Sequence, residues 1–464
     1  MTIITRTLLL PLAASLLLTE AMPVDAQTAT APTPAVAAPQ VSLLLPNYNS
    51  VPVGEVAALE GGAFVARAND TSAGFYNPAG LALADQSSIS GSAGAYQFGS
   101  VTPEGLTKVK DTIKQIPAMF GVVARDLLGR PRWAGGLTVA RAAAWNQAVD
   151  AEAVRAVSGD RSDRLRFSTD AKYDAWLVNL GLGYAYSDRL RLGATLDGQY
   201  TSISRRQSVT TQSVTSSALS TLGVGTLGNL STTHLRGTIG AQFKVSSSLQ
   251  VGAVLRTAGW GIIASGDASL ESLAQSGGAT AASAFFETEP SVEYRLPFEF
   301  KAGAAWIGTR AQAEFDVFTY AGTGQYAAIS STTPVTIVVD GGQGVVTVGE
   351  APYRGVQVDS STVVNIAVGG RYQLVEGRSW TLHGGYATDR SPVGPEDTGF
   401  TKVDLQHITV GVSGRTKLFL GSLGFRYSNG QSAPLGLGPI GDGTFATTFK
   451  VSSIGLVYSL ALLF

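Results

Sequence analysis

Few side chains in this sequence are suited to catalysis. The 464-residue chain contains three histidines, His234, His383 and His407, and no cysteine. The absence of cysteine excludes thiol chemistry and cysteine-ligated zinc, and none of the histidines lies in a recognisable nucleophile motif. We therefore predict no enzymatic activity, no catalytic residues, no metal site and no cofactor. A lipid hydrolase with one of these imidazoles as its base is the least favoured alternative.

Charged side chains recur at alternate positions of several stretches, where they would share one face of a strand. Arg236 and Arg256 are candidates for binding a carboxylate head group, because a guanidinium forms charge-assisted hydrogen bonds with carboxylates. Carboxylates occur on the same predicted face, so mutual ion pairing is the simpler interpretation. This face comprises Arg191, Asp197, Arg236, Arg256, Glu299, Lys301, Glu314, Asp316, Arg371 and Arg426.

The elements that must position these residues are strands with a period of two. In 173–186, Trp176 and Val178 alternate with small or polar residues, and the pattern resumes in 190–207 after the turn at 187–189. Fourteen such strands are predicted, at 87–98, 117–127, 132–144, 173–186, 190–207, 232–244, 249–265, 293–307, 311–321, 362–374, 380–388, 404–414, 417–429 and 448–464.

The connections between these strands alternate between short and long. Short turns such as 187–189 and 245–248 fall on one side, and longer segments such as 208–231 fall on the other. Barrels of outer membranes have this asymmetry, with short periplasmic turns and longer outer loops. The sequence therefore predicts an all-β fold, a 14-stranded antiparallel transmembrane β-barrel over 87–464, with both termini in the periplasm. A long loop at 333–358 is a candidate for an extra hairpin.

The overall composition suits a membrane protein better than a nucleic-acid-binding one. The formal net charge is -1, 14% of the residues are charged and 44% are hydrophobic. A near-neutral chain lacks the basic surface that nucleic acid requires. We expect outer-membrane lipid as a partner and no nucleic acid.

The N-terminal region has the features of a secretory signal. Arg6 precedes an apolar run at 8–18, and small residues at 24–26 occupy the positions that a signal peptidase reads. The run of about 11 residues is shorter than the roughly 20 that a membrane-spanning helix needs, which disfavours a permanent anchor. We predict that 1–26 is a removed signal peptide and that 27–45, rich in Ala, Pro and Thr, is a flexible lead-in.

The chain ends on an apolar strand whose last residue is aromatic. Ile454, Leu456, Tyr458 and Phe464 lie on one predicted face of 448–464. This ending is similar to the C-terminal signature by which bacterial outer-membrane barrels are recognised. We therefore expect the barrel assembly machinery to bind through Phe464.

Residues 46–86 do not alternate, yet they are too apolar for a solvated tail. A barrel of this strand number is too wide for its own side chains to fill, so we predict that the segment folds into the lumen as a plug. Within it, FYNPAGL at 75–81 combines an amide, a proline and a glycine, which predicts a defined turn. That turn either contacts a ligand or is purely structural. The motif residues are Asn77, Pro78, Ala79 and Gly80.

The sequence resembles the FadL/TodX family of outer-membrane transporters for long-chain fatty acids and hydrocarbons. The resemblance rests on EGGAFVARANDTSAGFYNPAGLALAD (60–85), the hairpin PAMFGVVARDLLGRPRWAGGLTVA (117–140), the hairpin around 187–189 and the terminal Phe464. It implies a barrel plugged by an N-terminal hatch that carries the Asn-Pro-Ala element. It also implies passive uptake of hydrophobic small molecules such as fatty acids or hydrocarbons. A general hydrophilic porin is the alternative function.

The resemblance further implies a route: capture between two outer loops, a lumenal pocket, plug movement and lateral exit at the third strand. By order along the chain, the capture loops would be 208–231 and 266–292. Their candidate capture residues are Leu219, Leu222, Val224, Leu227, Leu230, Leu270, Leu273, Phe285 and Phe286.

The third strand shows a local irregularity. Continuing the face shared by Trp133 and Leu137 would turn Arg141 towards lipid, where a charge is costly near mid-bilayer. Either the strand has reached the rim of the membrane there, or Gly135-Gly136 marks a bulge or kink. Family members often follow this strand with Pro-Phe-Gly, whereas this chain has Ala-Ala-Ala-Trp at 142–145.

Overall fold

The structure is a computed structural model, and a single compact unit, Pro34–Phe464, contains all of its described residues. The predicted signal peptide at 1–26 lies outside the described residues, and so does the predicted lead-in at 27–45 except for 41–42. The described residues are 41–42, 46–103, 114–156, 160–215, 218–342, 346–374, 379–394, 402–432, 435–440 and 443–464.

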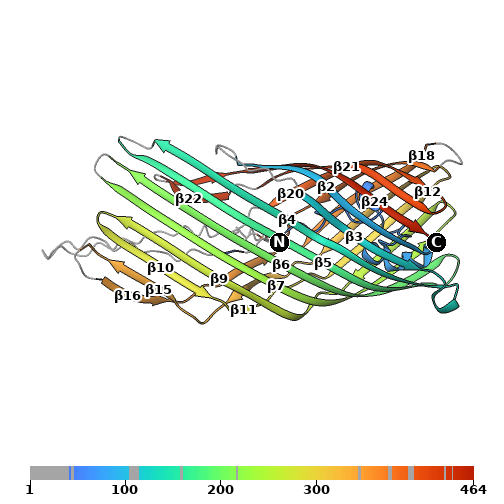
Figure 1. Cartoon of the computed structure of the whole chain (residues 1–464), viewed down its shortest axis with the longest axis horizontal. Helices are drawn as coiled ribbons and strands as arrows, with labels where there is room; N and C mark the ends of the chain where they lie inside the picture. The colour runs from blue at the N-terminus through green and yellow to red at the C-terminus, as the bar shows by residue number, and fades with distance from the viewer. Residues whose placement is uncertain are drawn as a thin grey trace, which may run out of the picture. The chain divides into compact units, whose positions relative to one another are not determined.

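Fourteen antiparallel strands of the described residues close into a barrel (Figure 1). The last strand pairs with the first, from Ser88↔Leu463 to Pro103↔Phe449, which completes the circle. The predicted all-β fold class and strand number are confirmed. In order, the strands are β2 (Ser88–Pro103), β3 (Lys114–Ala124), β4 (Trp133–Ala156), β5 (Ser162–Ala185), β6 (Leu190–Val214), β7 (Leu219–Lys244), β8 (Leu249–Arg256), β12 (Glu299–Ile307), β13 (Ala311–Tyr320), β18 (Val363–Gln373), β19 (Trp380–Asp389), β20 (Val403–Arg415), β21 (Phe419–Ser432) and β24 (Phe449–Leu463).

Side chains of the barrel strands alternate between an apolar outer face and a polar inner face. On β6, Leu196 is 60% exposed, whereas the next residue, Asp197, is fully buried. Trp133, Trp306 and Trp380 are exposed near the end of the barrel that carries the short turns. An outward apolar band flanked by aromatic residues is the pattern of a barrel that faces lipid.

Two segments predicted as outer loops, 208–231 and 266–292, are mostly strands. β6 and β7 pair over their full length. The second segment contains most of β9 (Trp260–Ser276) and all of β10 (Ala279–Glu287), and β9 pairs with the outer half of β7. The loop prediction was wrong because serine, threonine and valine continue the strand pattern beyond the apolar band, and β-branched residues favour extended backbone.

The hairpin expected within 333–358 is present. β15 (Val335–Asp340) pairs with β16 (Val346–Ala351), and β15 also pairs with β10. One sheet therefore continues through β7, β9, β10, β15 and β16 at the end of the barrel that carries the long connections. We call this end the upper end; it lies at the left in Figure 1. A separate hairpin is formed by β22 (Leu435–Ile440) and β23 (Gly443–Thr447).

A second sheet of four strands contributes to an apolar core near the upper end. Its order is β1 (Val41–Ser42), β17 (Val356–Ser360), β14 (Gly324–Ser330) and β11 (Ser291–Val292). Its side chains share one buried cluster with inward residues of β4 to β7, β9 and β10, which we call the upper cluster. The upper cluster consists of Ala143, Ala171, Tyr173, Ala175, Ile203, Leu230, Ala268, Leu270, Phe285, Tyr294, Leu296, Tyr326, Ala328, Ile329, Val335, Val356, Val358 and Val393.

Helical structure in the described residues is limited to short turns. In 46–86 these are η1 (Ala57–Leu59), α1 (Ala73–Tyr76) and η2 (Pro78–Leu83), and η3 (Leu127–Gly129) lies between β3 and β4. None of the helices in the described part of the chain has the length and apolarity needed to cross a membrane.

Candidate functional site

Residues 46–86, which we call the lumenal segment, contact the inward-facing side chains of the barrel. The backbone N–H groups of Phe64 and Val65 donate to Asp316 Oδ2 at 2.8 and 3.0 Å. The Ala66 N–H donates to Glu314 Oε1 at 2.5 Å. Both carboxylates come from β13 and are buried. These two inward charges therefore bind backbone of the lumenal segment.

A network of buried ion pairs fastens the lumenal segment nearby. Arg67 Nη2 lies 2.6 Å from Glu60 Oε2, and Arg67 Nε lies 2.7 Å from Glu314 Oε2. Glu60 Oε1 contacts His383 Nδ1 at 2.7 Å, and His383 Nε2 contacts Ser413 Oγ at 2.8 Å. Burial opposes ionisation of Glu60, but the Arg67 guanidinium outweighs it and lowers the pKa of Glu60 to about 2. Glu60 is therefore ionised at neutral pH.

Glu60, His383 and Ser413 are linked in the order of a serine hydrolase triad. All three side chains are buried, and the carboxylate is already neutralised by Arg67. Ser413 is not among the residues that line the lumenal cavity described below. The contacts of Glu60 with His383 and of His383 with Ser413 therefore connect the lumenal segment to the barrel wall.

The other two histidines also have structural partners. His407 Nδ1 contacts Ser428 Oγ at 2.8 Å, and His407 Nε2 contacts Asp389 Oδ2 at 3.3 Å. His234 Nε2 contacts the Tyr294 carbonyl at 2.8 Å. In the described part of the chain, no group of histidine and acidic residues is arranged to hold a metal ion.

Asn77 joins α1 to η2, and Pro78, Ala79 and Gly80 form the first half of η2. Asn77 Nδ2 donates to the carbonyl oxygens of Val65 at 2.8 Å and Ala241 at 3.0 Å. Asn77 Oδ1 accepts from the Ala79 N–H at 3.1 Å. Pro78 occupies the first position of η2, where its missing N–H has no helical partner to lose. The motif therefore ties two parts of the lumenal segment to β7.

The remaining motif residues are closely surrounded. Pro78, Ala79 and Gly80 are buried, and a Cβ on Gly80 would lie 2.1 Å from the Ala68 carbonyl oxygen. The motif is thus a structural turn in this conformation. A direct contact between the motif and a ligand stays a prediction.

Glycines on the barrel strands make room for the motif. A Cβ on Gly193 of β6 would lie 2.2 Å from the carbonyl carbon of Pro78. A Cβ on Gly240 of β7 would lie 2.1 Å from Asn77 Oδ1. Sequence reasoning missed both glycines, although a glycine at an inward strand position signals the close approach of another backbone.

The two arginines predicted to contact a head group lie in one buried charge cluster. Glu299 Oε1 lies 2.9 Å from Arg236 Nη1, and Glu299 Oε2 lies 3.1 Å from Arg256 Nη1. Asp197 Oδ2 is 3.3 Å from Arg256 Nε, and Lys301 Nζ is 3.4 Å from Glu299 Oε2. These residues are therefore ion-paired with each other. A head-group contact stays a prediction, and it requires a ligand carboxylate to displace Glu299 from one arginine.

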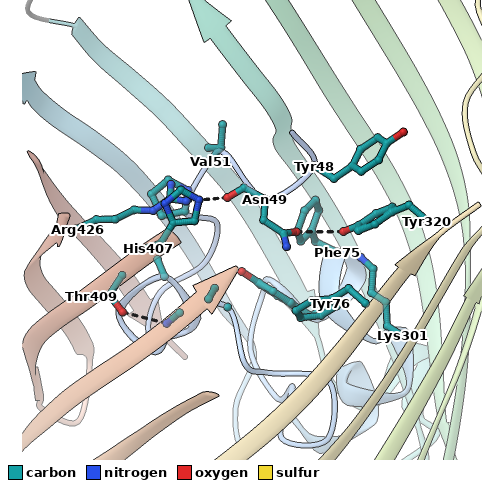
Figure 2. Close-up of a pocket in the computed structure, with 16 residues that line it drawn as sticks. Tyr48, Asn49, Val51, Phe75, Tyr76, Lys301, Tyr320, His407, Thr409 and Arg426 are labelled. Atoms are coloured by element: carbon teal, nitrogen blue, oxygen red, sulfur yellow. Dashed lines mark hydrogen bonds between the residues drawn. The ribbon is translucent and has the colours of Figure 1, made fainter. Parts of the chain in front are cut away.

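A cavity of about 50 Å³ lies between the lumenal segment and the barrel wall (Figure 2). Tyr48 stacks on Tyr320 with ring centroids 4.2 Å apart, and the Tyr320 hydroxyl donates to Asn49 Oδ1 at 3.0 Å. The full lining is Tyr48, Asn49, Val51, Pro52, Ala58, Gly61, Gly62, Phe75, Tyr76, Lys301, Phe318, Tyr320, Ala387, His407, Thr409 and Arg426. A dry cavity that binds benzene measures about 150 Å³, so this cavity is smaller than one that holds a single aromatic ring.

Sequence reasoning identified only part of this lining. Lys301 and Arg426 were among the predicted inward charges, but Tyr48, Asn49 and Tyr320 were missed. Arg426 Nη2 donates to the Asn49 carbonyl at 2.7 Å, which holds the start of the lumenal segment beside β21 (Figure 2). The sequence signal that could have identified this lining was Tyr320, an aromatic residue at an inward position of β13.

The candidate capture residues divide between the interior and the surface. Leu230, Leu270 and Phe285 are buried in the upper cluster. Leu219, Leu273 and Phe286 are exposed, and Leu222, Val224 and Leu227 are half-buried. The structure brings them together on the two faces of the sheet formed by β7, β9 and β10, rather than on two facing loops.

The irregularity of the third strand lies later than predicted. Gly135 and Gly136 pair in register with β5, and the register shift comes at Ala142. A Cβ on Gly136 would lie 2.6 Å from Leu81 Cδ2, so this glycine serves contact with the lumenal segment. β3 pairs with β4 only up to Ala140, and beyond it β5 is the only strand partner of β4 in the described residues.

Comparison with known proteins bears on the fold. No protein-family model matches the chain, and no curated relative matches it in sequence. The Pseudomonas putida toluene transporter TodX is similar over 90% of this chain and 99% of its own, with a TM-score of 0.57 and 14% identity. This chain has the FadL-type barrel fold.

Two further solved structures share the FadL-type fold. The Ralstonia pickettii toluene transporter TbuX matches over 90% of this chain and 99% of its own, with a TM-score of 0.53 and 14% identity. A Pseudomonas aeruginosa FadL homologue matches over 91% and 99%, with a TM-score of 0.50 and 15% identity. Identities this low establish a common fold, so function is argued from the site.

We predict that Gly193→Val displaces the Asn-Pro-Ala-Gly turn from the FadL-type barrel. The new side chain would overlap the Pro78 carbonyl group, and forcing extra volume into a packed site costs about 3 kcal/mol. Limited proteolysis of the folded protein in detergent should cut within 46–86 in the variant. The matched control is Gly198→Val on the same strand, where a Cβ meets nothing within 4 Å. Equal resistance of both variants would contradict the prediction.

Docking of the lumenal segment should weaken as pH rises towards neutrality. Burial, together with the nearby Asp70 carboxylate, raises the pKa of Glu55 from 4.5 to about 7. Between these values Glu55 holds a proton in the docked segment that it has lost in the released segment, so its contribution to docking is fully present below about pH 4.5 and declines through about pH 7. Hydrogen exchange of 53–84, corrected for intrinsic rates, should show less protection at about pH 8 than at about pH 5. Glu55→Gln should reduce the difference, and burial, which also raises the pKa of Asp70, accounts for what remains. An unchanged pH dependence in this variant would assign the effect elsewhere.

Proposed function

We propose that this protein is a passive outer-membrane transporter for hydrophobic small molecules, with long-chain fatty acids and hydrocarbons as the candidate classes. The observation that carries the proposal is a barrel with an apolar outer face whose lumen holds the tightly bonded lumenal segment. Solved structures with the same fold include two toluene transporters, which supports this substrate class.

The bonding of the lumenal segment argues against a general hydrophilic porin. A diffusion pore needs an open aqueous channel, which wide barrels otherwise provide. Here Asn47, Glu60, Arg67 and Asn77 each bridge from the lumenal segment to the barrel wall. We therefore assign 46–86 the role of a plug that blocks polar solutes.

The proposed route passes the apolar surfaces of the upper end and then the cavity, whose lining is both aromatic and charged. A lipophile contacts the exposed residues of β7, β9 and β10, enters the upper cluster and reaches the aromatic lining of the cavity once the plug moves. It leaves sideways where β4 loses β3 as a partner beyond Ala140. A carboxylate head group, if the substrate carries one, would be met by Arg236 or Arg256.

The same proposal covers export and assembly. Residues 1–26 act as a signal peptide, 27–45 as a lead-in and 87–464 as the membrane barrel with periplasmic termini. Phe464 is 64% exposed, and its N–H donates to the Ser87 carbonyl at 2.9 Å. An aromatic side chain in this position is accessible to the barrel assembly machinery before the barrel closes.

A disulfide between plug and wall tests whether the plug must move. Thr71 Oγ1 and Ser90 Oγ are hydrogen-bonded to each other across the plug and β2, and the chain has no cysteine of its own. Thr71→Cys with Ser90→Cys should therefore form a unique cross-link. In liposomes, we expect the unmodified protein to take up a labelled fatty acid or toluene but no sugar. The oxidised double variant should lose most of this uptake, and reduction should restore it.

The possible results separate the functions. Uptake that persists with the disulfide fully formed would contradict plug movement, and each single cysteine variant controls for the substitutions. Sugar flux through the unmodified protein would make it a porin. Release of fatty acid from phospholipid, lost in Ser413→Ala, would favour a hydrolase built on His383.

A further inference from the structure

Part of the barrel wall lacks a hydrogen-bonded ladder between neighbouring segments. The ladder of β8 with β12 ends at Arg256, and the ladder of β9 with β10 starts at Ala268. The segments between these points are 257–267 and 288–298, both of which are described. No strand pairing joins them, and we call these two segments the wall break.

The second segment of the wall break, 288–298, which we call the returning segment, forms its hydrogen bonds with elements other than β9. β11 pairs with β14, and the Glu293 N–H donates to the Ala328 carbonyl at 2.9 Å. The Pro297 carbonyl accepts from Arg236 Nη2 at 2.5 Å, and a proline has no N–H to offer to β9. Residues 288–298 are therefore held by the inner sheet and by lumenal side chains.

β9 is exposed on both of its faces along the wall break. All of 260–265 is exposed, whereas neighbouring strands alternate between exposed and buried residues. Trp260 is 78% exposed, Ile263 is 63% exposed and Ile262 is 54% exposed. A register shift in the pairing of β7 with β9 adds one residue, Ile262, at this place. Because β9 is apolar and exposed on both faces here, an apolar molecule can lie between β9 and the segment 288–298.

The wall break begins within the outer part of the lipid-facing band. On β7, the exposed outward residues Phe243, Ile239 and Leu235 mark a stretch of about 26 Å at the usual strand rise. With the usual tilt this is about 20 Å of height, inside an apolar band of about 25 Å. Trp260 pairs with Leu235. Above this level, where the barrel extends beyond the apolar band, water and lipid head groups can bond the unpaired backbone that hydrocarbon would not tolerate.

The upper cluster lies directly behind the wall break. Tyr294 and Leu296 of the returning segment belong to this cluster and are 9% and 5% exposed. A Cβ on Gly259 would lie 2.9 Å from Leu296 Cβ, so the residue before β9 closely approaches a member of the cluster. The contact between the two segments includes one long hydrogen bond, from the Gly259 N–H to the Leu296 carbonyl at 3.3 Å.

We propose that the wall break is a lateral passage by which an acyl or hydrocarbon chain of the outer leaflet reaches the upper cluster directly from the bilayer. Its β9 side from 258 to 264 is uncharged and apolar or small, and it is continuous with the lipid-facing band. Its other side, 288–298, carries the exposed ion pair of Glu293 and Arg295. The two segments can separate without breaking a ladder. The inference rests on the proposed transport of hydrophobic molecules and gives it an entrance separate from the gap between β3 and β4.

Fluorescence quenching tests the passage without requiring transport. A bimane label on Leu296→Cys, in bilayers of phospholipid brominated on the acyl chains, should be quenched nearly as strongly as one on Ile239→Cys, which faces lipid. A label on Ile203→Cys, buried behind the unbroken pairing of β6, should stay unquenched. A Leu296 label that behaves like the Ile203 label would overturn the passage. So would cross-linked dimers through Gly261→Cys with loss of quenching, because a second copy would then cover β9.

A disulfide staple provides a second and independent test. A Cβ on Gly266 would lie 3.0 Å from Val292 Cγ2 and 2.5 Å from the Asn229 carbonyl oxygen. Gly266→Cys with Val292→Cys should close the wall break when oxidised, and Gly266→Cys alone controls for displacement of the β7 backbone. We expect uptake of a fatty acid loaded into the outer leaflet to fall several-fold on oxidation and to return on reduction. Unchanged uptake with a complete staple would overturn the passage. If the unstapled protein takes up no lipophile, the proposed function fails instead, and quenching at Leu296 still decides the passage.

Discussion

The arrangement of the lumen depends on two buried carboxylates at alternate positions of β13. Asp316 binds two backbone N–H groups of the lumenal segment, while Glu314 binds a third and the guanidinium of Arg67. A buried polar group without a hydrogen-bond partner is destabilising, so each of these side chains requires the segment as much as the segment requires it. The segment therefore supplies hydrogen-bond donors to both acidic side chains of the wall.

Shape reinforces this electrostatic matching. Gly193 and Gly240 remove side chains from the inner surface at the place where Asn77 and Pro78 meet it. The backbone of the segment therefore contacts the backbone of the strands directly. The Asn77 amide donates to the carbonyl oxygens of Val65 and Ala241, which satisfies these buried acceptors. Polar contacts of the segment also reach β2, β4, β19 and β21, so the segment is hydrogen-bonded to the wall around the lumen.

The upper part of the barrel follows a different principle. Long hairpins extend the wall, and the inner sheet fills the space between them with apolar side chains such as Tyr326 and Ile329. Building that sheet withdraws the segment before β12 from its neighbour β9, because a backbone group can complete only a limited number of hydrogen bonds. The pairing of β11 with β14 therefore both fills the interior with apolar side chains and interrupts the wall beside β9.

The sequence by itself determined the alternation of apolar and polar positions, and with it the fourteen strands, the closed barrel and the inward charges, because a side-chain period of two is a local property of extended backbone. It also marked the turn at Asn77 and the hairpin within 333–358. Only the tertiary structure decided that Arg236 and Arg256 share Glu299 and that Tyr48 stacks on Tyr320. It also decided that the extra residue of the third strand is Ala142 and not Gly135 or Gly136. Those outcomes depend on which segments far apart in the chain become neighbours, and a local pattern carries no information about such pairings.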